Sequence, residues 1–338
     1  MRKLMSLLLS VILLLALAAP VGAASSRELD AAVSGAAAYL LRTVRSPEVG
    51  TLGGEWSVIG LARSGHSVPD SWFESYHRNV TRYVRERGGV LDERRLTEYS
   101  RVILAMTAAG FDPRDVAGHD LTVPLGDFDR VIWQGVNGPI FALLALDSLG
   151  YDIPRNPSAR TQATRELFVA EILRRQTPDG GWNLSAGANG AEVGRNERGD
   201  ADLTGMALQA LAKYQDDPTV RAATNRALRF LSRTQDASGG FSSGLAGGEP
   251  TVESAAQVLV ALTELGIPVN DPRFVKNGNT IVDNILSFQN ADGSFSHSPG
   301  SNEPSLMATE QALYGLVAAQ RAAGGMNSLY RMGNEVRR

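Results

Sequence analysis

Two carboxylates separated by one residue lie in the stretch RGDADLTGMAL, residues 198–208. Asp200 and Asp202 stand at the start of an apolar segment, and Thr204 follows after Leu203. Carboxylates that share a site cannot all ionise, so one of them can keep its proton and act as a general acid. The alternative is that Asp200 or Asp202 caps free backbone N–H groups at a helix start, where the helix dipole favours the ionised form. Contact with a ligand or an ion is a third use of the same pair.

Acidic and polar side chains recur at the starts of the other apolar segments. Carboxylates in these places suit a helix dipole, and a rim of them also suits the binding of sugars or cations. Together with the aromatic residues beside them, they form the predicted ligand-binding set. Its members are Glu55, Trp56, Glu98, Tyr99, Asn137, Thr204, Glu253, Thr309 and Glu310.

The composition argues against several kinds of site and partner. The chain has 338 residues, no cysteine and four scattered histidines, so disulfides and Cys-based zinc sites are not expected. The formal net charge is −3, which argues against nucleic acid or an anionic membrane surface as the main partner. We therefore expect no metal and no cofactor, and a small-molecule ligand as the partner.

Residues 1–23 have the form of an export signal. Arg2 and Lys3 precede an apolar run from Leu4 to about Ala19, and small residues follow it up to Ala23. An uncleaved membrane anchor is the alternative, but such an anchor needs a longer apolar span. We expect cleavage after Ala23 or Ala24, a secreted or cell-surface product without a membrane span, and a cell-envelope protein as one candidate partner.

Apolar residues recur with a helical period along nearly the whole chain. Amphipathic segments alternate with segments made almost wholly of Ala, Leu, Val and Gly, which indicates outer helices paired with buried inner helices. The predicted fold class is therefore all-α, an (α/α)6 toroid (barrel) of six helical hairpins over residues 24–325, with residues 326–338 as a flexible tail. The predicted segments are 28–44, 54–65, 71–87, 97–110, 137–150, 160–176, 202–215, 218–235, 252–266, 273–289 and 306–321, with a less regular stretch at 111–135.

The heptad Gln-x-x-x-Gly-(Gly/Ser)-aromatic occurs three times, as QTPDGGW, QDASGGF and QNADGSF. Each copy ends an apolar-periodic segment, so we interpret the heptads as an internal repeat and as a structural clasp with a tight glycine turn. Polar loops follow at 183–200, 242–250 and 296–304, and we expect them to gather at one end of the toroid, beside any binding site. The clasp residues are Gln176, Gly181, Trp182, Gln235, Gly240, Phe241, Gln289, Gly293 and Phe295.

The three heptads resemble the repeat motif of squalene and oxidosqualene cyclases and of protein prenyltransferase β subunits. The same toroid occurs in the cobalamin carriers related to intrinsic factor and transcobalamin. The stretches TEYSRVILAMTAAGFDPRDVAGHDL and TEQALYGLVAAQR are similar to exported bacterial members of this superfamily. The resemblance covers residues 28–325 and is more specific for fold than for activity. It implies that each clasp Gln ends an outer helix and bonds to the start of an inner one.

The resemblance also bears on Asp202. Triterpene cyclases of the protonating kind carry Asp-x-Asp-Asp-Thr at the start of an inner helix, and residues 200–204 match this pattern except at Leu203. Asp202 falls on the position of the protonating acid, but the loss of the third carboxylate weakens the arrangement. Protein prenyltransferases use Asp, Cys and His zinc ligands, which a chain without cysteine cannot supply. Cyclases also need aromatic rings to stabilise carbocations, and the inner segments offer few. These are Trp56, Tyr99, Phe141 and Tyr314.

We therefore expect an exported, non-catalytic binding protein whose ligand lies at the mouth formed by the inner-helix starts. By resemblance to the cobalamin carriers the leading ligand is a corrinoid, and an isoprenoid-like small molecule is the next. One alternative is a terpene or triterpene cyclase-like isomerase with Asp202 as general acid. The other is a glycan-binding or structural cell-envelope module, since exported lyases and glycosidases use similar toroids with paired carboxylates.

Overall fold

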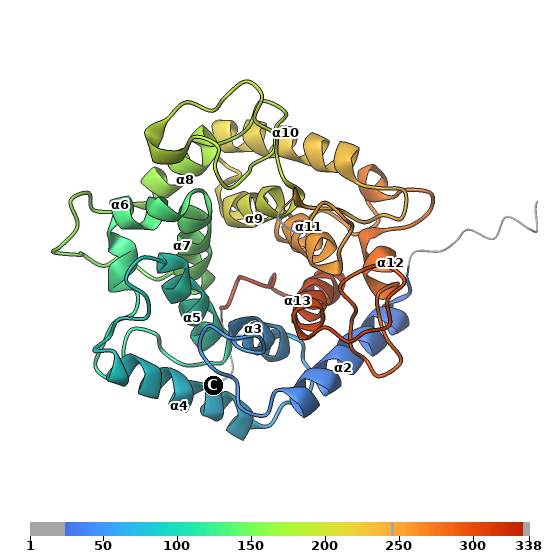
Figure 1. Ribbon diagram of the computed structural model, residues 1–338, viewed down its shortest axis with the longest axis horizontal. Helices are drawn as coiled ribbons and strands as arrows, with labels where there is room; N and C mark the ends of the chain where they lie inside the picture. Colours follow the sequence, from blue (N-terminus) through green and yellow to red (C-terminus); the bar gives the residue numbers. More distant parts are fainter. Residues whose placement is uncertain (1–23, 245–246, 334–338) are drawn as a thin grey trace, which may run out of the picture.

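The computed structural model describes residues 24–244 and 247–333, which form a ring of helices (Figure 1). Inner and outer helices alternate along the chain and in space, as the sequence predicts, and the described residues contain no strand. The inner helices are α3 (Glu55–Arg63), α5 (Leu96–Ala108), α7 (Asn137–Ser148), α9 (Ala201–Leu211), α11 (Val252–Glu264) and α13 (Leu306–Ala323). The outer helices are α2 (Ser26–Thr43), α4 (Asp70–Glu86), α6 (Phe128–Val131), α8 (Arg165–Arg174), α10 (Pro218–Thr234) and α12 (Ile281–Leu286).

The six inner helices close on themselves. Each packs against the next along the chain, and α13 packs against both α2 and α3, so the last repeat meets the first. The inner helices are buried nearly all round because they carry almost only small and apolar side chains. The predicted all-α toroid is confirmed.

Close packing between neighbouring inner helices depends on small residues. A Cβ atom added to Gly315 of α13 would lie 2.9 Å from the Cβ of Ala256 on α11. Any larger side chain at either position would push the two helices apart, and interiors at crystal-like density have no room to absorb this. The small-residue content of the inner segments is thus a requirement of the ring.

The clasp heptads tie each outer helix to the next one around the ring. The side-chain Nε2 of Gln176 donates to the carbonyl of Ala223 in α10 at 2.9 Å, and that of Gln235 donates to the carbonyl of Phe274 before α12 at 3.0 Å. The Nε2 of Gln289 donates to the carbonyl of Ala32 in α2 at 3.3 Å and so joins the last repeat to the first.

This pattern corrects the expected partner of the clasp Gln, which is the next outer helix rather than the start of an inner one. The side chain leaves the end of its own helix along the circumference of the ring, where the carbonyls of the following repeat lie. The inner helix is reached instead by the backbone N–H of the clasp aromatic. Trp182 donates to the hydroxyl of Thr204 and Phe295 to that of Thr309, each at 2.9 Å.

Two outer helices are shorter than their apolar pattern predicts. The segment 273–289 yields a helix only from Ile281, because Asn277 and Gly278 take positive φ and form a tight turn ahead of it. The segment 160–176 becomes helical only after Thr164, whose side chain caps α8 by accepting from the N–H of Leu167 at 3.2 Å. In both places local turn or cap chemistry overrides the apolar pattern.

The segment expected as a flexible tail, 326–338, packs against the ring in its described part. Leu329, Tyr330 and Met332 are buried, and the segment lies under the ring at the C-terminal ends of the inner helices. Its apolar residues are covered by that contact, which a local sequence pattern does not reveal. The predicted export signal (1–23) and the chain end (334–338) lie outside the described residues. Within the described part, no helix has the length and apolar character needed to cross a bilayer.

We expect Gly293→Ala to destabilise the protein through the closure of the ring. Gly293 has φ +88°, and an added Cβ would lie 2.5 Å from the carbonyl oxygen of Gly35 in α2. Left-handed strain and overpacking together should lower the free energy of unfolding by roughly 3 kcal/mol. Urea unfolding measures this change.

Gly300→Ala is the matched control for that substitution. Gly300 has φ +72°, but an added Cβ would meet nothing within 4 Å. It should therefore show only the conformational cost, roughly 1 kcal/mol. Equal losses in the two variants would show that the contact between the third clasp turn, at Gly293, and α2 adds nothing to closure.

Candidate functional site

All six inner helices begin at the same end of the ring, and the predicted acidic residues collect at this mouth. Asp202 and Glu253 stand in the first turns of α9 and α11, while Glu55 and Glu310 stand near the starts of α3 and α13. The partial positive charge of each helix start favours a carboxylate there. The mouth thus brings together side chains that are far apart in the sequence.

Asp200 is a structural cap. Its Oδ1 accepts from the N–H groups of Asp202 (2.9 Å) and Leu203 (3.3 Å), and its Oδ2 accepts from the Ser243 hydroxyl (2.7 Å) and the Gly244 N–H (2.9 Å). Both oxygens are thereby occupied by α9 and by the loop after the second clasp. The capping interpretation holds for Asp200, which leaves Asp202 as the chemically available member of the pair.

Asp202 lacks a hydrogen-bond partner at one buried oxygen. Among the described residues, no donor reaches its Oδ1, which is shielded from solvent. Burial raises the pKa of this carboxyl to about 6, and the neighbouring charges of Asp200 and Glu253 act in the same direction. The helix start alone would favour the ionised form, as expected from the sequence, but desolvation outweighs it. Asp202 can therefore hold or release a proton near neutral pH.

A histidine from the third post-clasp loop completes this side of the mouth. The Nδ1 of His297 lies 3.0 Å from both carboxylate oxygens of Glu253. The His297 side chain is 42% exposed and that of Glu253 only 13%, so the pair sits at the rim. The prediction that the loops 183–200, 242–250 and 296–304 meet at one end agrees with this contact and with the Ser243–Asp200 bond.

The neighbouring part of the mouth, at the starts of α13 and α3, holds a second pair of buried acids. The Oε2 of Glu310 accepts from the Gly53 N–H and the Ser57 hydroxyl, each at 2.9 Å. Glu55 accepts from the Gly50 N–H at 3.0 Å. Burial raises the pKa of Glu310 to about 7 and also raises the pKa of Glu55. Desolvation therefore favours the protonated, uncharged forms of both carboxyl groups.

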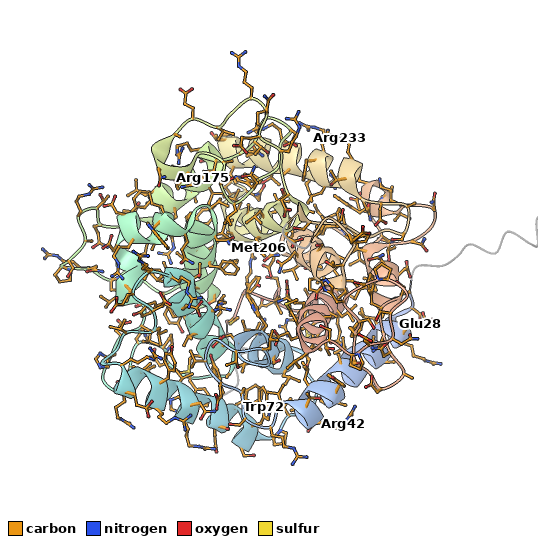
Figure 2. The ribbon with its side chains drawn as sticks, in the orientation of Figure 1. Glu28, Arg42, Trp72, Arg175, Met206 and Arg233 are labelled. Carbon is orange, nitrogen blue, oxygen red and sulfur yellow. The ribbon has the colours of Figure 1, made fainter. Side chains whose placement is uncertain are left out.

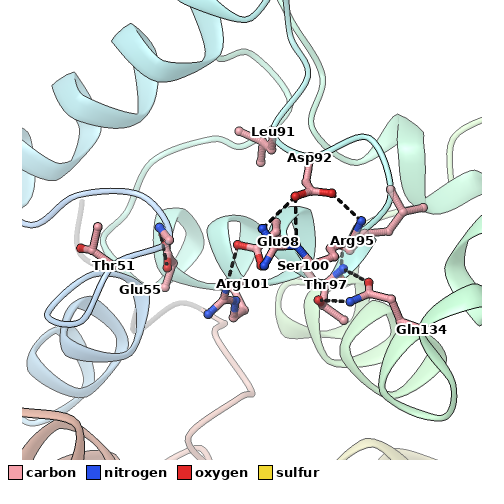
Figure 3. A network of polar contacts seen from close by, with 12 residues as sticks. Thr51, Glu55, Leu91, Asp92, Arg95, Thr97, Glu98, Ser100, Arg101 and Gln134 are labelled. Carbon is pink, nitrogen blue, oxygen red and sulfur yellow. Dashed lines mark hydrogen bonds and ion pairs between the residues drawn. The ribbon is translucent and has the colours of Figure 1, made fainter.

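Arg101 of α5 supplies a positive charge next to these acids. Its guanidinium pairs with Glu98, and its field lowers the pKa values of Glu55 and Glu310, against the larger effect of burial. Figure 3 shows Glu55, Glu98 and Arg101 together at the starts of α3 and α5, next to the Asp92–Arg95 pair of the preceding loop. Glu98 is thus engaged inside the protein.

Below the acids, three aromatic side chains from three inner helices meet inside the ring. Trp56 of α3 stacks on Tyr314 of α13 with ring centroids 5.7 Å apart, and it meets Phe141 of α7 at 6.0 Å with a tilt of 58°. We call Trp56, Phe141 and Tyr314 the aromatic tier. The side chain of Met206 on α9 points toward the same central region (Figure 2).

The aromatic tier contains one buried hydroxyl that lacks a hydrogen-bond partner within the described residues. Tyr314 is fully buried, and no hydrogen-bond partner for its hydroxyl occurs among the described residues. Burial raises its pKa well above the usual value for tyrosine, so the hydroxyl keeps its proton and can donate. A buried polar group without a partner marks a place where a ligand or a water can bind.

Three glutamines form an amide ladder across neighbouring inner helices. The Nε2 of Gln209 (α9) donates to the Oε1 of Gln257 (α11) at 3.0 Å, and the Nε2 of Gln257 donates to the Oε1 of Gln311 (α13) at 3.2 Å. Sequence analysis missed these residues and His297. For Gln257 the available signal was its place four positions after Glu253 on an otherwise apolar helix.

Several predicted ligand-binding residues are engaged inside the scaffold. The hydroxyls of Thr204 and Thr309 accept from the clasp aromatics, and the hydroxyl of Tyr99 accepts from the Leu91 N–H at 3.0 Å. Asn137 at the start of α7 has a buried Oδ1 that no donor reaches among the described residues. In the same part of the chain, no group of three or more His, Asp or Glu side chains is arranged to hold a metal ion.

Comparison with known proteins places this arrangement in a family. Residues 135–306 match the family model of the prenyltransferase alpha-alpha toroid domain. No curated protein matches the chain in sequence.

Solved structures share the fold at low identity. Protein geranylgeranyltransferase-I of Candida albicans complexed with GGPP is 12% identical with a TM-score of 0.55, covering 84% of this chain and 90% of its own. Unsaturated glucuronyl hydrolase from Bacillus sp. GL1 is 13% identical with a TM-score of 0.58, covering 90% and 99%. The type II terpene cyclase MstE from Scytonema is 14% identical with a TM-score of 0.52, covering 88% and 98%. At such identities the likeness concerns the fold alone.

The raised pKa of Asp202 predicts a pH-dependent gain in stability from Asp202→Asn. A pKa raised from 3.8 to about 6 favours folding below pH about 4, and this contribution is lost as the pH rises through 6. The asparagine variant avoids that loss, so its advantage should grow to roughly 3 kcal/mol above pH 7. Urea unfolding of both proteins between pH 4 and 8 measures the difference.

Asp200→Asn is the control, because its carboxylate accepts four hydrogen bonds that an amide cannot all replace. This variant should be less stable than the wild type at pH 7. An Asp202→Asn advantage that stays constant with pH would contradict the raised pKa.

Proposed function

Because this chain belongs to the prenyltransferase alpha-alpha toroid family, we propose that it binds a small amphipathic molecule of the isoprenoid type in the centre of the ring. The observation that carries this proposal is the pair of buried, unpaired polar atoms above and within the aromatic tier, Asp202 Oδ1 and the Tyr314 hydroxyl. The electrostatic influence of Asp202 on Tyr314 indicates that the two groups share one region of the interior.

The apolar part of the ligand would lie against the aromatic tier. Trp56 is only partly buried, although it stacks on Tyr314, so part of its ring remains available for contact. Aromatic rings supply large apolar area with little loss of side-chain freedom, and burying a ligand chain against them is favourable by roughly 25 cal/mol per Å². A surface of three contacting rings is apolar, which suits a hydrocarbon chain better than a corrinoid, whose rim carries polar amide groups. For this reason we place the isoprenoid ahead of the corrinoid that the sequence favours.

The polar end of the ligand would meet Asp202 and Tyr314. A hydroxyl group can accept from the Tyr314 O–H and donate to the ionised Asp202 carboxylate, which satisfies both unpaired atoms. Each buried group that is left without a hydrogen bond costs about 1–3 kcal/mol. A ligand that bonds to one of these groups removes this cost and binds more tightly by the same free energy. The His297–Glu253 pair at the rim lies on the path that such a ligand would follow.

Acid catalysis at Asp202 is the second candidate function, favoured by its raised pKa beside the aromatic tier. The protonated carboxyl would transfer its proton to one carbon of an alkene, whose π electrons form the new C–H bond. The neighbouring carbon becomes a cation that the rings of the tier stabilise. Loss of a proton from an adjacent carbon to the Asp202 carboxylate gives the isomerised alkene and restores the acid.

We also propose that the protein is exported, on the strength of residues 1–23. The residue at which the secreted product begins tests this directly. N-terminal sequencing that starts at residue 24 or 25 would support export, and an intact Met1 would contradict it.

Binding is tested by calorimetry with geranylgeraniol, cobalamin and a neutral glycan panel. We expect saturable binding of the prenyl alcohol alone. Trp56→Ala should weaken it at least tenfold through lost apolar contact, and Tyr314→Phe several-fold through one lost hydrogen bond. Trp133→Ala is the matched control, since that tryptophan is 60% exposed on the outer surface. Equal effects of the two tryptophan substitutions, or binding of cobalamin alone, would overturn the isoprenoid proposal.

Catalysis is tested by incubating the protein with geranylgeraniol and analysing the products by mass spectrometry. If Asp202 is the acid, an isomerised product forms, and Asp202→Asn abolishes it although the variant unfolds at a midpoint no lower than that of the wild type. Absence of product from the wild type removes the catalytic candidate and leaves binding. Product from the variant at the wild-type rate removes Asp202 from the mechanism.

A further inference from the structure

A surface hollow of about 800 Å³ lies between the end of α4, the loop that leads into α5 and the segment ahead of α7. Neither the rings of the aromatic tier nor Asp202 line it, so it is separate from the central site. Its lining combines two aromatic rings with three arginines and two acids. A hollow of this composition offers both apolar contact and charge to a ligand.

Trp133 presents a broad apolar surface to this hollow. It is 60% exposed, whereas Trp72 and Trp182 are buried. The backbone that carries it is held by the next residue, Gln134. The Oε1 of Gln134 accepts from the Thr97 N–H and its Nε2 donates to the Thr97 hydroxyl, each at 3.0 Å (Figure 3). A flat ligand that packs on the Trp133 ring therefore has little of the protein to order, which favours binding.

Two arginines reach the hollow without an acidic partner. The Arg94 guanidinium lies 5.5 Å from the centroid of the Trp133 ring. The Arg87 guanidinium lies 4.3 Å from the centroid of the Tyr83 ring. Within residues 24–244 and 247–333, neither guanidinium pairs with a carboxylate. Stacking on a ring orients each guanidinium and leaves its N–H groups free to donate to an anion.

The loop ahead of α5 fixes the place of Arg94. The Oδ1 of Asp92 accepts from the N–H groups of Arg94 (2.8 Å) and Arg95 (2.7 Å), and its Oδ2 pairs with the Arg95 guanidinium at 2.8 Å. The Leu91 N–H donates to the Tyr99 hydroxyl at 3.0 Å and ties the loop to α5. Asp92 and Arg95 thus neutralise each other and shape the loop, and Arg94 remains available to a ligand.

The charges that remain in the hollow indicate the class of that ligand. Once Asp92 and Arg95 are paired, the lining has the two free arginines and the carboxylate of Glu93. A nucleic acid carries a phosphate at every nucleotide, and both Glu93 and the net charge of −3 on the chain would repel it. A sugar acid carries one carboxylate on each ring, and its hydroxyls can donate to Glu93.

The shape of a sugar ring agrees with the same choice. A pyranose presents a face of C–H groups, which packs on an indole because the face of an aromatic ring is negative. The planar guanidinium of arginine matches the two oxygens of a carboxylate and can bind both at once. One aromatic platform with an arginine stacked on it therefore suits a ring that bears a carboxylate.

We infer that this hollow is a second binding site, which takes an acidic polysaccharide of the uronic acid class. A sugar ring packs on Trp133, the guanidinium groups of Arg94 and Arg87 bind carboxylates of the polysaccharide, and Glu93 accepts from its hydroxyls. The site lies outside the centre of the ring, so this inference does not depend on isoprenoid binding.

The choice of ligand is tested by calorimetry with oligogalacturonate, oligomannuronate, the methyl ester of each, and oligothymidylate. The wild type should bind at least one uronate, and added salt should weaken that binding because charge pairs hold the ligand. The methyl ester, which lacks the charge, should bind at least tenfold more weakly. Failure to bind either uronate, equal affinity for the ester, or tighter binding of oligothymidylate would each overturn the inference.

The place of the site is tested with variants titrated with the uronate that binds. Trp133→Ala should lower the affinity at least tenfold, and Arg94→Gln should lower it several-fold while leaving the affinity for the methyl ester unchanged. Arg114→Gln is the matched control, since its guanidinium also lies 5.5 Å from a ring centroid, that of Tyr151, but outside the hollow. Wild-type affinity in Trp133→Ala or Arg94→Gln, or an equal loss in Arg114→Gln, would overturn the site, with unfolding midpoints showing that each variant is folded.

Discussion

Closure of the ring is the constraint on which the rest of the structure depends. Each inner helix is apolar on nearly every side and needs a neighbour on both flanks, which an open row of helices cannot give to its two ends. The first and last repeats supply the missing neighbours to each other. Gln289 reaches the Ala32 carbonyl, and Gly293 passes the backbone of Gly35 closely. Without that junction, α3 and α13 would expose apolar faces to water.

Closure also fixes the chemistry of the two ends, because all inner helices run in the same direction. Their starts favour negative charge and their ends favour positive charge. Asp202, Glu253 and Glu310 accordingly lie at one end, whereas Arg63 and Arg321 lie at the other. The second end is then occupied by the protein's own C-terminal segment. The ring is therefore polar along its axis.

Surroundings, rather than residue type, decide what each carboxyl can do. Glu171 of α8 is also largely buried, but Arg174 and Arg175 pair with it and lower its pKa despite the opposing effect of burial. Asp202 and Glu310 have no such partner within salt-bridge distance among the described residues, and burial raises their pKa values to about 6 and about 7. The Glu171 carboxylate therefore stays ionised and serves as a structural anion. The other two stay close to a change of protonation at neutral pH, as ligand binding or proton transfer requires.

The amino-acid sequence by itself determined the fold class, the order of inner and outer helices and the place of the clasps. These features follow from local periodicity and from a repeated heptad, and both act over short distances along the chain. It also determined that the acids would stand at helix starts, because the position of Asp202 or Glu253 depends only on its own helix. Where prediction from apolar periodicity failed, as before Ile281 and Thr164, a turn or cap residue in the sequence carried the missing information.

Only the tertiary structure decided how these side chains are used. Thr204 and Thr309 turned out to hold clasp aromatics, and Trp56, Phe141 and Tyr314 turned out to meet, because their contacts join residues from different repeats. The raised pKa of Asp202 comes from burial that no single helix provides. The segment after α13 is held against the base of the ring because buried Arg63 and Glu264, which lie far from it in the sequence, bind its backbone. Periodicity describes one element at a time, whereas burial and pairing across the ring exist only once all six hairpins have closed.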